Sequence, residues 1–477
     1  MTTRTMQTPR LLVVSNRAPI ELQPGHRGPT VTRTVGGLAT ALDAALRERG
    51  GTWVAWVGQA TDEVLDPDLT GLGYPIRAVR LKEREIHQYY AGFANQVLWP
   101  LCHTFPARCN FQDAFWRAYR QVNERFAAAV KHEVGAPGDL VWVNDFHLCL
   151  LPGFLRAAQT PARVGVFWHI PFPPPTVFGI CRWREELLGG LLGADLIGLQ
   201  TDGDVENFLA CVRQFLGLPV TDSPPGIRLP DRTVRVVALG IGIDAVRFRT
   251  EVEDASVREH AARLRATLGA DQVLIGVDRL DYTKGIVERL IAYERFLERQ
   301  LEWRRRVCLV QITVPSRFRV PDYREMKRTI DETVGRILGR FTHDGHAPLA
   351  YHYSAFDHER LAAYYAAADV ALVTPLRDGM NLVAKEYVAC HPRGDGVLVL
   401  SEFAGAAHEL RDALLVNPYD PDSICRRIET AVTMPADERR RRMRALGRRV
   451  AQRDIRWWTT TFLELLAEPD GATALIA

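Results

Sequence analysis

A chain of 477 residues is too long for one hydrophobic core, so two large domains are expected. Apolar residues make up 47% of the chain and charged residues 25%, as in an ordinary globular protein. The net charge of +3 argues against general nucleic-acid binding, and no apolar run reaches the roughly 18 residues of a membrane span.

The eight cysteines are scattered, and no two of them form a C-x-x-C pair. The chain also begins without the pattern of a signal peptide. We therefore expect a cytoplasmic protein with reduced thiols. The sequence leaves the oligomeric state open, a homo-oligomer included.

The first strand is predicted over residues 11–15, and Arg17 follows its end. Gly36 and Gly37 then open an Ala/Leu-rich helix. Such a pair lets a ligand approach the backbone closely, although most Gly–Gly pairs are only turns. Residues 89–100 are rich in aromatic side chains and are predicted to be a loop, which either fills the core or stacks against a sugar.

Two later strands, over 140–143 and 163–167, end in ionisable side chains. Asp145 follows the first strand and His169 the second. In open α/β sheets this edge borders the ligand crevice. One histidine there is more often structural, but several such positions favour a site. Strands alternating with helices predict a doubly wound α/β domain, with residues 240–259 as its link to the next.

The second half repeats this plan. A strand over 273–278 leads to a loop with Arg279 and Lys284, which suit the neutralisation of a diphosphate. Helices are predicted over 286–300, 322–339 and 358–367. The basic run 439–449 has helical spacing and is interpreted as a solvated helix face. Apolar positions over 455–465 predict a last helix that crosses back to the first domain.

The stretch 377–386 joins a predicted buried strand to a helix through a turn that contains Gly379. Free amides and the helix dipole make such a turn a site for anions. Asp378 lies in the loop, and Glu386 lies one turn into the helix. A phosphate on the amides with carboxylates beside it suits a sugar nucleotide. A simple helix cap with a solvated Glu386 explains the stretch about equally well.

Further cations follow strand ends in both halves. Arg17 and Arg317 could hold a second anion, which fits a nucleotide-sugar donor and a phosphorylated acceptor. Metal-binding Asp-x-Asp spacing occurs at Asp66/Asp68, Asp202/Asp204 and Asp420/Asp422. All three pairs fall in turn contexts where aspartate is common, so no metal is expected. Arg279 and Lys284 would supply the positive charge instead.

Six segments resemble the trehalose-6-phosphate synthase family: 13–17, 35–38, 144–148, 169–173, 279–285 and 377–387. The resemblance extends from about Leu11 to Leu466. It implies an α/β protein of the GT-B fold, with two Rossmann-like doubly wound domains facing across a cleft. The domains would span 1–245 and 246–455, with 456–477 as the returning helix and no phosphatase domain.

The same resemblance implies a metal-independent, retaining hexosyltransferase without a cofactor. It would move glucose from a nucleotide-glucose donor, with UDP-glucose favoured, to glucose 6-phosphate, and give α,α-trehalose 6-phosphate. The implied mechanism is front-face attack, in which the leaving phosphate takes the acceptor proton. Its partners would be these small molecules, with no nucleic acid and no membrane.

Individual roles also follow from the resemblance. The implied donor-binding residues are Gly37, Arg279, Lys284, Asp378, Gly379, Met380, Asn381, Leu382, Val383 and Glu386. The implied acceptor-binding residues are Arg17, Tyr90, Trp99, Asp145 and Arg317. The implied catalytic set is Asp145, His169, Arg279, Lys284 and Asp378. His169 and Asp378 would hold the donor glucose, and Glu386 the ribose.

The chain departs from the family pattern near the acceptor. Asn144 and Phe146 stand where the family usually has histidine and tyrosine, and Thr104 and Phe105 stand where it has tyrosine and arginine. These changes keep open a glucosylglycerol-phosphate synthase that uses glycerol 3-phosphate. A catalytically silent relative that senses sugar phosphates is a further alternative. A phosphorylase would need a pyridoxal-phosphate lysine, and Lys284 is better explained as a diphosphate ligand.

Overall fold

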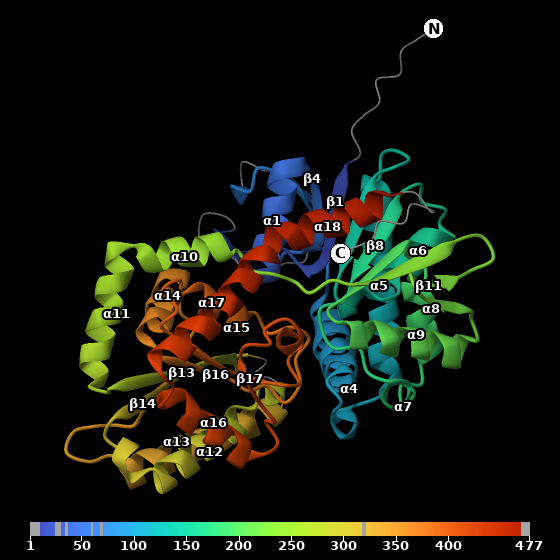
Figure 1. Cartoon of the computed structure of the whole chain (residues 1–477). Helices are drawn as coiled ribbons and strands as arrows, with labels where there is room; N and C mark the ends of the chain where they lie inside the picture. Colours follow the sequence, from blue (N-terminus) through green and yellow to red (C-terminus); the bar gives the residue numbers. More distant parts are fainter. Residues whose placement is uncertain are drawn as a thin grey trace. The chain divides into compact units, whose positions relative to one another are not determined.

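The computed structural model describes residues 10–23, 30–33, 37–58, 61–66, 70–316 and 321–468. The chain folds into two compact units (Figure 1). The first unit comprises Met1–Gly240 and Trp458–Ala477, and the second comprises Ile241–Trp457. The sequence put the boundary at residue 245, and the structure puts it between 240 and 241. Helix α18 (Ile455–Ala467) carries the chain back to the first unit.

The first unit is built on one sheet, in which ten strands of the described part have the order β10-β11-β12-β9-β8-β7-β1-β4-β6-β5. Its parallel centre runs from β12 to β6, and the pairings at both edges are antiparallel. The strands are β1 (Leu11–Arg17), β4 (Gly51–Trp56), β5 (Val64–Leu65), β6 (Ile76–Ala78), β7 (Leu140–Asn144), β8 (Arg163–Phe167), β9 (Leu196–Leu199), β10 (Val220–Asp222), β11 (Pro225–Arg228) and β12 (Thr233–Ala238). A separate hairpin pairs β2 (Ile20–Gln23) with β3 (Thr30–Arg33).

Helices connect these strands. They are α1 (Gly37–Arg49), α3 (Glu83–Glu85), α4 (Trp99–Cys102), α5 (Asp113–Glu133), α6 (Leu151–Ala157), α7 (Pro175–Phe178), α8 (Arg184–Leu191) and α9 (Asp202–Leu216). The π-helix η1 (Ile86–Leu98) and the short 3-10 helices η2 (Pro106–Arg108) and η3 (Phe146–Leu148) complete the set. The run of apolar residues in each central strand reflects burial on both faces of a parallel sheet.

The prediction of a loop over residues 89–100 is wrong, because this segment is helical. Residues 86–98 form the π-helix η1, and α4 follows directly. Tyr89, Phe93 and Val97 recur at every fourth position and are fully buried, which is the pattern of a helix face. Phe93 packs against Tyr119 of α5, with ring centroids 4.5 Å apart. Most of the aromatic side chains therefore fill the core.

Helix α18 covers the sheet of the first unit. Trp458 and Phe462 pack on Trp142 of β7, with ring centroids 5.0 and 4.8 Å apart. Gly198 of β9 leaves the space for this contact, because a Cβ there would lie 3.0 Å from the Phe462 ring. The last helix thus completes the core of the first unit.

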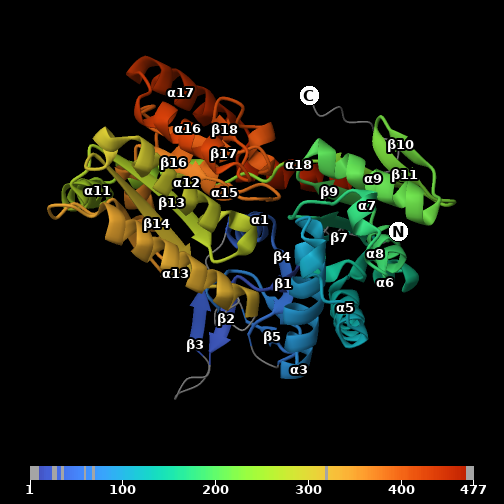
Figure 2. The same cartoon turned by 90° about the horizontal axis from the view of Figure 1, so that it is seen from below.

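The second unit has a parallel sheet, whose six strands in the described part have the order β15-β14-β13-β16-β17-β18. They are β13 (Gln272–Arg279), β14 (Val307–Val314), β15 (Leu349–His352), β16 (Val370–Val373), β17 (Val397–Ser401) and β18 (Leu414–Val416). Helices α12 (Ile286–Arg299), α13 (Pro321–Phe341) and α16 (Pro421–Val432) bury their apolar residues on one face. Helices α14 (His358–Ala367), α15 (Leu382–Ala389) and α17 (Ala436–Gln452) lie on the other face (Figures 1 and 2).

The predicted link over 240–259 is mostly helical. Residues 245–253 form α10 (Ala245–Glu253), and α11 (Ala255–Leu268) follows. Asp244 caps α10 by accepting from the amide of Arg247, and Asp254 caps α11 by accepting from Ser256. The two aspartates are therefore helix-start signals inside a polar stretch. None of the helices in the described part combines the length and apolar character that a membrane crossing demands.

Candidate active site

The turn after β16 is held by its own side chains. Asn381 has a φ of +73° and caps α15, where its Oδ1 accepts from the amide of Ala384 at 3.3 Å. Its Nδ2 donates to Asp378 Oδ2 at 2.9 Å. Asparagine tolerates this left-handed conformation better than most residues. The side chain thus ties the carboxylate of Asp378 to the N-terminal cap of α15, a helix whose first amides are those of Leu382 and Val383.

A neighbouring segment fixes the backbone of the same turn. The amide of Gly405 donates to the carbonyl of Asp378 at 3.1 Å, and that of Ala406 donates to Met380 at 2.8 Å. A Cβ at position 405 would lie 1.8 Å from the carbonyl oxygen of Gly379, so only glycine fits there. Residues 378–380 are therefore held from outside as well as from within.

Lys284 reaches this turn from the loop after β13. Its Nζ donates to Asp378 Oδ2 at 2.5 Å, and both side chains are more than four-fifths buried. Gly285 follows with a φ of +64°, and a Cβ there would lie 2.1 Å from the carbonyl oxygen of Thr374. The two loops that the sequence predicted separately therefore meet at one cation–carboxylate pair. Arg279, the last residue of β13, is exposed at the same strand end.

A buried arginine lies beneath these loops. Arg289 of α12 is fully buried, and its guanidinium bonds to side chains in or just after three strands. It donates to Asp278 Oδ2 of β13 at 2.5 Å and to Gln311 Oε1 of β14 at 3.0 Å. It also donates to Thr374 Oγ1, just after β16, at 3.0 Å and to the carbonyl of Lys284 at 3.4 Å. Arg289 therefore ties the Lys284 loop to the sheet.

Sequence reasoning missed Arg289, although a signal for it exists. Arg289 lies between Ile286 and Tyr293 on the apolar face of α12, where a charged residue is out of place unless it has partners. Burial raises the pKa of its partner Asp278, while the Arg289 charge opposes that rise. A buried charge pair of this kind is destabilising to break.

Glu386 is not the solvated residue of the simpler interpretation. Its Oε2 accepts from the hydroxyl of Tyr365 at 3.0 Å, and burial raises its pKa to about 7, against a lowering by that hydrogen bond. Glu386 can therefore exchange a proton near neutral pH while facing a hydroxyl donor.

Lys385 directly precedes Glu386 in α15, but its side chain contacts a different set of residues. It is buried, and its Nζ donates to the carbonyl of Ile241 at 2.8 Å and pairs with Glu409 at 2.7 Å. It anchors α15.

In the first unit, Asp145 and His169 lie together at the ends of β7 and β8. Asp145 has a φ of +75°, and its Oδ1 accepts from the amide of His169 at 3.3 Å. The His169 ring lies 3.1 Å from Asn144 Oδ1 and packs beside Trp458 of α18. Burial lowers the pKa of His169 to about 3, so the ring is neutral at neutral pH. A neutral imidazole suits hydrogen bonding to a sugar hydroxyl.

Arg17 is held by aromatic rings. Its guanidinium carbon lies 5.2 Å from the ring centroid of Trp56 and 5.1 Å from that of Tyr90. Tyr90 in turn stacks on His147, at 5.7 Å. The result is an exposed cation with a fixed position next to the Asp145 end of the sheet. Trp99 is only 5% exposed and packs on His103, so in this structure it contributes to the core.

Several of the remaining predicted residues lie at helix starts. Gly37 begins α1, while Gly36 and Arg317 lie outside the described residues. Asp204 accepts from the amide of Phe172 and from Thr201, and Asp420 caps α16, which is the turn chemistry expected of the Asp-x-Asp pairs. Asp68 lies outside the described residues. Within the described ranges, no three His, Cys, Asp or Glu side chains gather in a group that could hold a metal ion.

The chain matches one family model, that of "Glycosyltransferase family 20", over residues 9–468. The chain belongs to glycosyltransferase family 20. It is therefore a glycosyltransferase, and the resemblance that its motifs carry is confirmed.

Named relatives agree with the family. The chain is 42% identical to the trehalose-6-phosphate synthase of Mycolicibacterium smegmatis, over 96% of this chain and 93% of that one. It is 44% identical to a bifunctional trehalose-6-phosphate synthase/phosphatase of Thermoproteus tenax. That match covers 97% of this chain but only 64% of the relative's length.

Solved structures agree as well. One is an α,α-trehalose-phosphate synthase (UDP-forming) from Burkholderia xenovorans in complex with glucose-6-phosphate. It superimposes with a TM-score of 0.88 at 34% identity and covers 96% of this chain and 100% of that one. The expected GT-B fold, with a doubly wound α/β plan in each unit, is confirmed.

Replacing Arg289 with lysine should destabilise the second unit. Lysine keeps the charge near Asp278 but has no planar fork with which to reach Gln311 and Thr374 as well. We expect the free energy of unfolding to fall by roughly 1–3 kcal/mol, as for lost buried hydrogen bonds, measured by denaturant titration. Arg295→Lys is the matched control, because Arg295 lies on the same helix in a half-exposed ion pair with Asp422. Equal stability of the two variants would contradict the role of Arg289.

The partly buried Glu386 should make stability depend on pH. The folded protein keeps the Glu386 proton up to about pH 7, whereas the unfolded chain releases it near 4.5. The unfolded state is therefore favoured progressively as pH rises through this interval, by up to about 1.4 kcal/mol for each pH unit.

Glu386→Gln carries no such proton. We expect the wild-type protein, without ligand, to lose stability relative to this variant between about pH 4.5 and 7, with no further change above that range. Denaturant titrations of both proteins at several pH values measure the difference. A difference that is independent of pH would show that Glu386 does not titrate there.

Proposed function

We propose that the protein is an α,α-trehalose-6-phosphate synthase, which transfers glucose from UDP-glucose to glucose 6-phosphate with retention at the donor carbon. The observation that carries this proposal is the turn after β16, where Lys284, Asp378 and the first amides of α15 come together. Membership of glycosyltransferase family 20 and the names of its relatives support the choice of substrates.

The donor is assigned to the second unit. Arg279, Lys284 and the amides of Leu382 and Val383 take the diphosphate, because two cations and a helix N-terminus offset its charge. Asp378 accepts from the glucose hydroxyls, together with the backbone of Gly379, Met380 and Asn381. Lys284 is bonded to Asp378, and this pair fixes the position of its ammonium group.

Two further groups complete the donor assignment. Glu386 accepts from the ribose hydroxyls, and its hydrogen bond from Tyr365 supports a role as a hydroxyl-binding carboxylate. Gly37, through its backbone, is also assigned to the diphosphate, and His169, through a neutral ring, to the glucose.

The acceptor is assigned to residues of the first unit and to Arg317. Arg17, Tyr90 and Arg317 bind the phosphate of glucose 6-phosphate, and Trp99 and Asp145 position its sugar. The contacts of Arg17 with the rings of Trp56 and Tyr90 support this assignment. A guanidinium that is already held in position loses little conformational freedom when it binds the phosphate.

The chemistry requires no nucleophilic side chain. The C1 hydroxyl oxygen of the acceptor forms a bond to donor C1 on the face from which the diphosphate leaves. The bond from C1 to the phosphate oxygen breaks, and that oxygen takes the acceptor proton. Arg279 and Lys284 stabilise the charge that develops on the leaving group, without a metal.

A cytoplasmic setting is part of the proposal. All eight cysteines are free thiols, which a reducing compartment preserves, and seven of them are buried.

An initial-rate panel tests the function. UDP-, GDP- and ADP-glucose should be combined with glucose 6-phosphate and with glycerol 3-phosphate, in the presence of a chelator. We expect nucleotide release that is fastest with UDP-glucose, requires glucose 6-phosphate and gives α,α-trehalose 6-phosphate. Turnover only with glycerol 3-phosphate would assign a glucosylglycerol-phosphate synthase. Ligand binding without turnover of any donor would assign a sensing relative, and loss of turnover in the chelator would refute metal independence.

Two substitutions separate the donor and acceptor assignments. Lys284→Ala should lower kcat by roughly two to three orders of magnitude, as the loss of one charge-stabilising donor typically does. Arg17→Ala should mainly raise the KM for glucose 6-phosphate, because it binds ground and transition states alike. Initial rates with each substrate varied in turn measure both effects. An Arg17→Ala effect confined to the donor KM would contradict the acceptor assignment.

A further inference from the structure

A second group of cations lies in the second unit, away from the Lys284–Asp378 pair. A pocket of about 450 Å³ is bounded by the segment after η6 (Gly405–His408) and the last turns of α17. Its lining includes His408, Arg411, Arg448, Arg449 and Gln452. We name this cavity the α17 pocket. Its volume is within the range of small-molecule sites.

The carboxylates of the α17 pocket are already paired. Glu409 bonds to the buried Lys385 at 2.7 Å and lies 4.0 Å from Arg453, and Asp412 lies 3.4 Å from Arg441. Among the described residues, no hydrogen bond or ion pair joins the guanidinium of Arg448 or of Arg449 to a partner. The pocket therefore carries an excess of positive charge.

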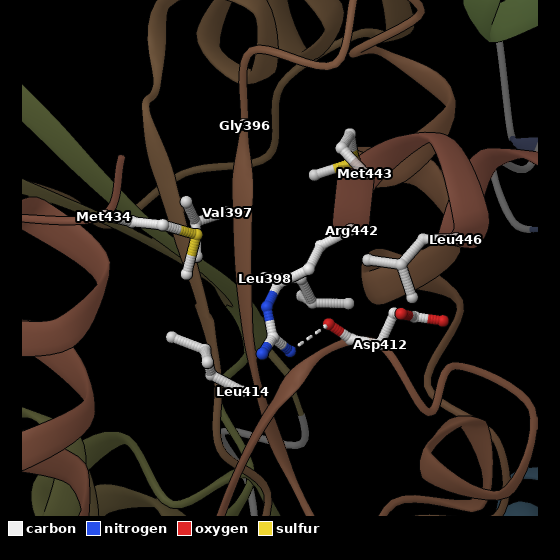
Figure 3. A pocket seen from close by; sticks show the side chains of 9 residues that line it. All are labelled: Gly396, Val397, Leu398, Asp412, Leu414, Met434, Arg442, Met443 and Leu446. Carbon is white, nitrogen blue, oxygen red and sulfur yellow. Dashed lines mark hydrogen bonds between the residues drawn. The ribbon is translucent and has the colours of Figure 1, made fainter. Parts of the chain in front are cut away.

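The floor of the α17 pocket is firmly packed. Figure 3 shows Met443 and Leu446 of α17 directed at the apolar side chains around Val397, and Leu446 lines the α17 pocket as well. Beside them, Arg442 Nη1 donates to the backbone oxygen of Asp412 at 3.0 Å. The helix and the segment that carry the cations are thus fixed to each other.

We propose that the α17 pocket binds the phosphate group of a small phosphorylated molecule and thereby stabilises the turn 378–386. Guanidinium groups match phosphate oxygens in paired hydrogen bonds, and an excess of arginines in one concave site is the chemistry that selects this ligand.

Two routes connect the α17 pocket to the turn. The first is backbone: Gly405 and Ala406 donate to Asp378 and Met380, and the amide of Glu409 donates to Ala406 at 3.1 Å. The second is the side chain of Glu409, which holds Lys385 of α15. A ligand beside Glu409 therefore acts on both ends of the donor-binding turn.

The sign of the effect follows from the charges around Lys385. Burial lowers the pKa of Lys385, its pair with Glu409 raises it, and Arg453 and Arg449 lower it by repulsion. A phosphate on Arg449 offsets that repulsion and favours the charged form of Lys385, which pairs with Glu409. The ligand thus holds α15 more firmly, so it should increase donor affinity.

Hydrogen–deuterium exchange of the full chain locates the ligand. Inorganic phosphate and glycerol 2-phosphate serve as probes, and we expect slower exchange in residues 405–412, 445–452 and 378–386. The variant Arg448→Gln/Arg449→Gln should weaken this response at least 10-fold in apparent Kd. The control Arg440→Gln/Arg444→Gln removes the same charge from the same helix outside the pocket and should keep it.

The two probes distinguish the sources of the phosphate. A tighter response to glycerol 2-phosphate assigns a phosphorylated metabolite, and a tighter response to inorganic phosphate assigns the free ion. Slower exchange that is confined to the first unit, or that is equal in the pocket variant and its control, would overturn the proposal.

The coupling between the α17 pocket and donor binding is measured by calorimetry with UDP-glucose in the presence and absence of glycerol 2-phosphate. We expect donor binding to tighten by a factor within about 5 to 150, the usual range of allosteric coupling, and this factor should vanish in the pocket variant. No change in the wild-type protein would overturn the link to the turn. Only this measurement rests on the proposed donor, so failure of the proposed function leaves the exchange result independent.

Discussion

The second unit depends on one buried charge. Arg289 reaches from an apolar helix face to the end of β13, the middle of β14 and the residue after β16, and its guanidinium also bonds to the carbonyl of Lys284. Parallel strands end at a common edge of the sheet. Without Arg289, the loops that follow these strands would be attached to the sheet only where each loop joins its own strand. A planar cation with several donors holds three neighbouring strands and a loop at once. The position of Lys284, and with it the proposed donor site, follows from this network.

Next to that network, two separate sets of contacts hold the turn after β16. Asn381 holds the carboxylate of Asp378 from within, and the segment at Gly405 holds the backbone from outside. Such double support keeps donors and acceptors in place before a ligand binds, which lowers the reorganisation that binding and transfer require. The pair of Lys385 with Glu409 extends the support to the far side of α15. This is why a second anion site there can reach the turn.

The first unit uses aromatic contacts instead. Arg17 lies against two rings, and His169 is neutral because it is buried beside Trp458 of the returning helix. Trp458 comes from the far end of the chain, so the C-terminal helix helps to set the surroundings of a residue predicted to contact the donor sugar. The packing of α18 on Trp142 and the environment of His169 cannot be separated.

The sequence by itself determined the alternating α/β plan, the strand ends that carry Arg17, Asp145 and His169, and the turn from Asp378 to Glu386. These follow from local patterns: apolar runs give buried strands, and glycine, asparagine and aspartate mark the turns. Only the tertiary structure decided which polar groups meet. The Lys284–Asp378 pair joins residues from different loops, and Arg289 acts through three strands. The helical form of residues 86–98 likewise emerges from packing on α5, because long-range burial outweighs local propensity.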